Sequence, residues 1–152
     1  MKSGFTLIEL IVTFGIIAVL LALVAPNFLS LQTRTTLHQT SVELISDIRG
    51  QQLNAMTNSQ TAFGVYFDPD QYILFTGSVY NVSAPGNFTV PLGPTVNFSA
   101  VNIPGSSLVF LPGSGEVSGF NGSANTLSLS DSQDGASFTF TLNKIGVITS
   151  VQ

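Results

Sequence analysis

Few residues of this chain are of a type that performs covalent or acid–base chemistry. It contains one histidine, His38, and no cysteine. A histidine base needs a carboxylate to orient it and a nucleophile within reach, and no acid stands beside His38. Ser114 lies between two glycines but lacks the G-x-S-x-G spacing of a nucleophile elbow. We therefore interpret His38 as a solvated helix residue and predict no catalytic residues and no enzymatic activity.

Two glycine-rich stretches, residues 113–116 and 119–122, share only their glycine content with phosphate-binding loops. Neither ends in the Lys-Ser/Thr pair that contacts phosphate and magnesium in such loops. Glycines of this kind are typical of turns, because they adopt backbone conformations that other residues avoid. We expect turns at both places and no cofactor.

Residues 131–135, Asp-Ser-Gln-Asp-Gly, form the only stretch with candidate oxygen ligands for a metal. Calcium is bound by carboxylates and carbonyl oxygens. The stretch lacks the complete D-x-[DN]-x-[DN]-G spacing and a following bidentate glutamate. We therefore predict a turn and assign no metal ligand, while calcium binding between Asp131 and Asp134 stays open.

The composition indicates one domain and disfavours binding to nucleic acid. The chain has 152 residues, which suits a single compact unit with a protruding element. Its net charge is −4, and only 8% of its residues are charged. The basic side chains are scattered rather than clustered, so no stripe is available to neutralise phosphates: Lys2, Arg34, Arg49 and Lys144.

The N-terminal segment, residues 5–25, is apolar apart from two threonines and Glu9. As a helix it would reach about 32 Å, which matches the hydrocarbon thickness of a bilayer. An ordinary secretory signal is disfavoured, because the run is long, contains an acid near its start, and is followed at once by Pro26. We predict a helix that spans a membrane.

Glu9 is the residue of this segment that most needs an explanation, since an ionised carboxylate in the apolar core costs roughly 2.5–3.5 kcal/mol on insertion scales. If the chain is cut after Gly4, the new amino group on Phe5 lies four residues away and can pair with Glu9 of the same or a neighbouring chain. The alternative is a protonated carboxyl, or one that reaches the interface without a partner. Position alone leaves both interpretations open.

Residues 2–10, Lys-Ser-Gly-Phe-Thr-Leu-Ile-Glu-Leu, resemble the class III signal of type IV pilins and type II secretion pseudopilins. The resemblance covers residues 1–26, including Pro26. It implies cleavage between Gly4 and Phe5 by a prepilin peptidase, N-methylation of Phe5, and Glu9 as the assembly carboxylate that faces a neighbouring subunit. The implied partners are other pilin or pseudopilin subunits, the prepilin peptidase, an inner-membrane assembly platform and membrane lipid.

Beyond the apolar segment, the period of the sequence predicts a second helical half. Pro26 should bend the helix near Ala22, because it removes one backbone hydrogen bond. Helical spacing then continues to about Asn58. The expected apolar stripe contains Leu37, Ser41, Leu44, Ile45, Ile48 and Ala55, and we expect Val42, Leu53 and Met56 to widen it.

From residue 61 the period changes to two, which predicts strands. Residues 61–67 and 72–76 should form a hairpin around a turn of about four residues at 68–71. Residues 77–107 are rich in Gly, Pro, Asn and Ser and predict loops with one or two short strands. Further strands are expected at residues 108–111, 126–129, 138–142 and 145–151, and together the strands should form an antiparallel sheet.

The sequence thus predicts an α+β fold in which a long N-terminal helix packs on a C-terminal antiparallel β-sheet domain. Its parts are a leader at 1–4, a transmembrane and assembly helix at 5–26, an amphipathic outer helix at 27–58 and a β-rich domain at 59–152. The layout resembles H-type minor pseudopilins and the related fimbrial-biogenesis minor pilins.

By that resemblance the protein is a structural subunit of a type IV pilus or secretion pseudopilus, held by one helix in the inner membrane with its β-rich domain outside the cytoplasm. The alternative is a pilin-like module for DNA uptake or adhesion, in which a carbohydrate or other surface ligand would bind exposed aromatics such as Tyr72 or Tyr80. For these tyrosines we favour packing within the predicted hairpin region.

Overall fold

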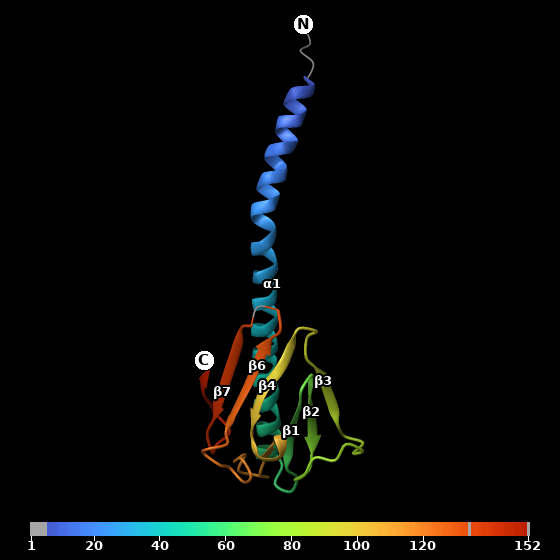
Figure 1. Ribbon diagram of the computed structural model, residues 1–152. Coiled ribbons are helices and arrows are strands. Elements are labelled where there is room, and N and C mark those ends of the chain that lie inside the picture. The colour runs from blue at the N-terminus through green and yellow to red at the C-terminus, as the bar shows by residue number, and fades with distance from the viewer. Residues whose placement is uncertain (1–5, 134, 152) are drawn as a thin grey trace.

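The computed structural model describes residues 6–133 and 135–151, except for the side chains of residues 22–35, 150 and 151. A long helix comes first, and the strands follow it. One half of the helix lies against a β-rich domain, and the other half projects away from it (Figure 1). The predicted α+β fold is confirmed.

Helix α1 spans Leu7–Thr57 and packs on the strands through one face of its C-terminal part. Leu37, Leu44, Ile48 and Ala55 are each no more than 1% exposed. Their spacings of four and seven residues place them on one side of a helix with 3.6 residues per turn. Ser41 is buried on the same face, where its hydroxyl donates to the His38 carbonyl at 2.7 Å. This confirms the predicted stripe.

Three apolar residues that we expected to widen this stripe face outward instead. Val42, Leu53 and Met56 are 53%, 60% and 51% exposed. Val42 comes five residues after Leu37, and so it is rotated about 140° away from the buried face. The expectation was wrong because both sheets contact the helix over a narrower arc than the apolar residues cover.

The helix ends at Thr57 and is capped by Asn58, close to where the sequence indicates. The Asn58 backbone is extended, and its N–H donates to the Asn54 carbonyl at 3.1 Å. The Asn58 side-chain oxygen then accepts from the backbone N–H groups of Gln60 and Thr61, both at 3.0 Å. This side chain satisfies the first backbone donors after the helix and turns the chain toward the first strand.

The strands form two four-stranded antiparallel sheets rather than the single sheet that we expected. The first has the order β3-β2-β1-β5, with β1 at Phe63–Asp68, β2 at Gln71–Thr76, β3 at Phe88–Pro91 and β5 at Ser107–Phe110. The second has the order β4-β6-β7-β8, with β4 at Val96–Asn102, β6 at Thr126–Asp131, β7 at Ser137–Leu142 and β8 at Ile148–Val151. A short 3₁₀ turn, η1 at Pro104–Ser106, precedes β5.

The chain changes sheets between β3 and β4. The Leu92 N–H donates to the Asp70 carbonyl, and the Phe98 N–H donates to the Pro69 carbonyl, both at 2.9 Å. These bonds hold the connection against the β1–β2 turn, so that β4 continues into the second sheet. The rings of Phe67 and Phe98 meet edge to face across the junction, with centroids 5.4 Å apart. Alternating polarity predicts strands but does not say which distant edges pair, and a single sheet was therefore wrong.

The predicted β1–β2 hairpin is present with a shorter turn than expected. Asp68 pairs with Gln71, and this leaves two residues between the strands in place of about four. The Gln71 amide also donates to the Asp68 carboxylate at 3.1 Å, which extends the ladder to the turn. Within residues 77–107, where we expected loops with one or two short strands, residues 96–102 form one strand, β4, with an irregularity between Phe98 and Ala100.

Gly64 in β1 is required by close packing. A Cβ at this position would lie 2.5 Å from the Phe75 ring and 2.8 Å from the Leu108 carbonyl oxygen. The backbone of β5 and the ring of Phe75 occupy the space that any larger residue needs. The glycine therefore permits β1 to pair with β5, the edge strand of the first sheet.

Candidate functional site

The first turn of α1 carries a complete capping box between Thr6 and Glu9. The Thr6 side-chain oxygen accepts from the Glu9 N–H at 3.4 Å, and the Thr6 backbone N–H donates to the Glu9 carboxylate at 3.1 Å. The Thr6 hydroxyl donates to the same carboxylate oxygen at 2.9 Å. A carboxylate here also interacts favourably with the positive end of the helix dipole.

This geometry assigns Glu9 a partner that our sequence analysis missed. The Thr-x-x-Glu spacing before an apolar run is itself the signal of a capping box, and it is legible at residues 6–9. Within one chain, the Glu9 carboxylate therefore has a partner and a defined position, because Thr6 holds it at the start of the helix.

The side chains around Glu9 are apolar and exposed. Leu7, Ile8, Leu10 and Ile11 are between 51% and 77% exposed, and no described strand covers this part of the helix. Exposed apolar side chains remain over the described stretch up to Leu21. A surface of this kind needs an apolar partner, such as lipid or another helix.

The described residues contain no helical stretch that is both long and apolar enough to cross a membrane. The expected membrane segment, residues 5–26, extends past the described side chains at both of its ends. Gly4 and Phe5, the predicted processing and methylation residues, lie outside the described residues, and the bend expected near Pro26 falls within residues 22–35. These expectations stay predictions.

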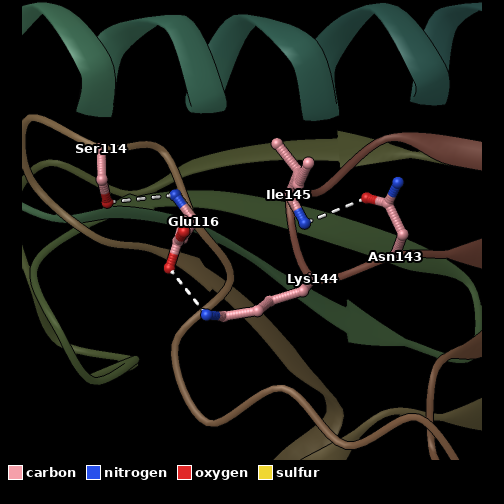
Figure 2. Close-up of polar contacts among 5 residues, drawn as sticks. All are labelled: Ser114, Glu116, Asn143, Lys144 and Ile145. Atoms are coloured by element: carbon pink, nitrogen blue, oxygen red, sulfur yellow. Dashed lines mark hydrogen bonds and ion pairs between the residues drawn. The ribbon is translucent and has the colours of Figure 1, made fainter.

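The opposite end of α1 is fastened to two loops of the β-domain. The Gln52 side-chain amide donates to the Gly115 carbonyl at 3.0 Å and to the Ile145 carbonyl. Beneath the helix, the Lys144 ammonium lies 3.3 Å from the Glu116 carboxylate, and the Ser114 hydroxyl accepts from the Glu116 N–H (Figure 2). The turn predicted at residues 113–116 is thus confirmed, and in addition it contacts the helix.

Residues 143–147 form a turn rather than the start of the last strand. The Asn143 side-chain oxygen accepts from the N–H groups of Ile145 and Val147, both at 3.0 Å (Figure 2). Gly146 has a φ of +77°, and a Cβ there would lie 2.5 Å from the Phe110 ring. The strand that we expected from residue 145 therefore begins at Ile148.

Tyr72 connects the helix to the first sheet. It is 1% exposed, and its hydroxyl donates to the Asp47 carboxylate at 2.6 Å. Burial, the hydrogen bond to Asp47 and the negative charge of Asp47 together raise the pKa of Tyr72 well above its ordinary value. The packing that we favoured for Tyr72 is therefore confirmed, and the alternative of an exposed ligand contact does not hold for this residue. Tyr80 is half-buried and stacks on Tyr66, with centroids 4.1 Å apart.

Among the described side chains, none of the other titratable groups joins His38 or Asp131, the other residues considered for chemistry, in a cluster. His38 is exposed on α1, and its ring meets the edge of Phe138 at 6.2 Å. Asp131 is 1% exposed, and its two carboxylate oxygens accept from the Thr95 hydroxyl and the Gln133 N–H, both at 2.8 Å. Asp134 lies outside the described residues, and among the described ones no three potential metal ligands cluster.

Comparison with known proteins identifies the N-terminus. Residues 1–25 match the family described as the prokaryotic N-terminal methylation motif, the signal of type IV pilins and pseudopilins. No curated protein and no solved structure matches the chain. The match covers the predicted processing site, Glu9 and the first turns of α1.

Proposed function

We propose that this chain, which carries the N-terminal methylation signal of type IV pilins and pseudopilins, is a structural subunit of a pilus or secretion pseudopilus. The match at residues 1–25 carries the proposal. The exposed apolar half of α1 supports it, since that surface suits burial first in lipid and then among other helices. The protein would be anchored in the inner membrane with the β-domain outside the cytoplasm and would then move into the filament.

In this function, Gly4 and Phe5 flank the bond that the prepilin peptidase cuts. Cleavage leaves Phe5 as the first residue, directly before Thr6, and its amino group is then N-methylated. The Glu9 carboxylate, held by Thr6 in the free chain, pairs with the Phe5 amino group of a neighbouring subunit. Such a pair compensates the cost of placing both charges in an apolar surrounding.

We further propose a minor, H-type role within such a filament. The features that support it are the two sheets against α1 and the bridge between Phe110 and Val117, next to which the Val117 N–H donates to the Lys144 carbonyl at 2.9 Å. Identification of neighbouring subunits by cross-linking in the native membrane tests this role. A minor subunit is expected beside a more abundant pilin, whereas a filament composed chiefly of this chain would contradict the role.

Binding of DNA is the weaker alternative. Among the side chains that the structure describes, the basic ones are Arg49 and Lys144, and Lys144 already pairs with Glu116. A duplex-binding surface needs several phosphate contacts at once. A structural role in a filament needs no such cluster of basic side chains and no bound ligand.

Mass spectrometry of the mature N-terminus, with the protein purified from its native membrane, tests the proposed function. The expected product starts at Phe5 and carries one N-methyl group. A product that starts at Met1, or beyond residue 25, contradicts the proposal, because neither is made by a prepilin peptidase. Deletion of the peptidase is the control and should leave the leader in place.

A further inference from the structure

The loop between β5 and β6 contains Asn121-Gly122, the one place in the sequence where an asparagine precedes a glycine. Asn121, Gly122 and Ser123 are all exposed. The loop lies at the end of the β-domain away from the projecting half of α1 (Figure 1). Water therefore reaches the Asn121 side chain in the folded protein.

Asn121 forms a tight turn with the residues that follow it. Its side-chain oxygen accepts from the Ser123 N–H at 3.0 Å, and its backbone carbonyl accepts from the Ala124 N–H at 2.9 Å. The first bond closes a ring that contains both the Asn121 Cγ and the Gly122 nitrogen, so the turn keeps these two atoms close together. No described residue accepts a hydrogen bond from the Gly122 N–H or from the Asn121 Nδ2.

These contacts favour attack of the Gly122 nitrogen on the Asn121 Cγ. The Ser123 N–H donates to the oxygen on which negative charge develops during the attack, as the donors of an oxyanion hole do. Gly122 has no side chain that would hinder the approach of its own nitrogen. The turn thus supplies an electrophile, a nucleophile and a stabilising donor within three adjacent residues.

We propose that Asn121 is a site of spontaneous deamidation in the folded protein. The Gly122 nitrogen loses its proton to a base and bonds to the Asn121 Cγ, the Cγ–Nδ2 bond breaks, and the nitrogen leaves as ammonia. Water then opens the resulting five-membered imide at either carbonyl, so the products are aspartate and isoaspartate. Each conversion consumes one water and releases one ammonia. The site does not depend on the proposed function, because the reaction needs no partner protein.

A second turn of the same geometry lacks the glycine. Asn81 is exposed, its side-chain oxygen accepts from the Ser83 N–H at 3.0 Å, and its carbonyl accepts from the Ala84 N–H at 3.0 Å. The residue after Asn81 is Val82, whose branched side chain crowds the nitrogen that would have to attack. We therefore expect Asn81 to keep its amide, and the two turns form a matched pair.

Conversion of Asn121 adds a negative charge at the edge of a small cavity. Asn121 lines this cavity together with apolar side chains that include Ile103 and Pro104. A carboxylate is less favourable than an amide beside such side chains. In isoaspartate the main chain also runs through Cγ, so the bonds to Ser123 and Ala124 cannot both form. We expect the turn to loosen and the amide hydrogens of Ser123 and Ala124 to exchange faster.

Mass spectrometry of peptides from the full-length protein, kept folded in detergent at mildly alkaline pH, tests the proposal. The peptide that contains Asn121 should gain the mass difference between OH and NH₂ before the peptide that contains Asn81 does. Electron-transfer fragmentation should show isoaspartate as well as aspartate at position 121. The rate should rise with pH, because the attacking group is the deprotonated Gly122 nitrogen.

Exchange of the residues that follow the two asparagines is the matched control. Gly122→Val should slow the conversion of Asn121 by about tenfold or more, whereas Val82→Gly should make Asn81 convert as well. Both substitutions fit the fold. The φ of Gly122 is not positive, and a Cβ there would meet only the Phe120 ring, at 3.9 Å. Val82 is 78% exposed.

Faster conversion of Asn121 than of Asn81, slowed by Gly122→Val, supports the site. If Asn121 keeps its amide, or converts no faster than Asn81, the proposal is overturned. An unchanged rate in Gly122→Val also overturns it, since the Gly122 nitrogen would then not be the nucleophile. Conversion of Asn121 in urea but not in the folded protein would contradict the role of the turn.

Discussion

At the scale of single residues, Glu9 has one partner in the structure, Thr6, and a second one only in the assembly that we propose. In the free chain its carboxylate is bonded to Thr6, while assembly as proposed requires it to face a second chain. Capping boxes contribute about 0.5–2 kcal/mol, so this bond organises the first turn without locking it. The free chain thus presents an ordered helix start to its neighbour.

Glu9→Ala should be processed normally after Gly4 but should enter filaments poorly, because the neighbour's Phe5 amino group would lose its counter-charge. The measurement is the ratio of filament-bound to membrane-bound protein. Thr6→Ala is the matched control, since it removes the capping hydroxyl and keeps the carboxylate. Wild-type incorporation of Glu9→Ala would contradict the assembly role.

Gly4→Phe should block processing, and normal maturation of that variant would contradict the assigned cleavage site.

Because of Tyr72, we expect the folded protein to lose stability at alkaline pH. Folding raises the pKa of Tyr72, so the folded state favours the protonated hydroxyl. The resulting stabilisation is present below the ordinary tyrosine pKa of about 10 and is lost as the pH rises above it. Tyr72→Phe should be less stable than wild type by about 1–2 kcal/mol near neutral pH, since the hydrogen bond to Asp47 is lost.

Denaturant unfolding of both proteins in detergent, between about pH 8 and pH 11, checks this expectation. The stability difference should shrink as the pH rises, because only wild type must keep this tyrosine protonated in its fold. A difference that stays constant over the range would show that Tyr72 is not the titrating group.

At the scale of elements, the C-terminal end of α1 is held by the side-chain amide of Gln52 in addition to burial. Gln52 is the residue that bonds carbonyls from two loops widely separated in sequence. Both loops turn at glycines with positive φ, Gly115 and Gly146. The helix therefore orders the turns that connect the strands.

Gln52→Ala should lower the free energy of unfolding by about 1–3 kcal/mol, because two loop carbonyls would lose their donor. Gln39→Ala, on an exposed position of the same helix, should change it by less than about 0.5 kcal/mol. Thermal or denaturant unfolding measures both variants. Equal losses of unfolding free energy in the two variants would show that the Gln52 amide contributes little to stability.

At the scale of the whole molecule, α1 is the shared core of two sheets. Leu44 and Ile48 belong to the same buried cluster as Val65 and Tyr72 from the first sheet and Leu127 from the second. Neither sheet buries its inner face without the helix. The two sheets should therefore fold and unfold as one unit, although they share no strand.

Leu44→Ala should destabilise both sheets together, by about 2–5 kcal/mol. The three tyrosines lie in the first sheet or its connecting loop, so tyrosine fluorescence reports on that sheet. Hydrogen exchange of β6 and β7 reports on the second. Wild type and variant should each show one coincident transition by both probes, and separated transitions would contradict a shared core.

Much of the architecture was predictable because its signals are local. The change of period near residue 61 separates helix from strands, and the spacing of Leu37, Leu44 and Ile48 identifies the buried face. The match at residues 1–25 is likewise carried by neighbouring residues. Thr6 belongs with these features, since the signal of its capping box was present and overlooked.

Other features depend on residues that only the folded chain brings together. Asp47 and Tyr72 are 25 residues apart, and Gln52 and Ile145 are 93 apart. The change of sheets at β4 depends on bonds to the β1–β2 turn, and the outward position of Val42, Leu53 and Met56 depends on how much of the helix the sheets contact. The sequence alone determined where the helix gives way to strands and which signal stands at the N-terminus, because period and motif are properties of adjacent residues. The tertiary structure decided which edges pair and which apolar residues stay exposed, because those outcomes arise from competition among distant surfaces for the same core.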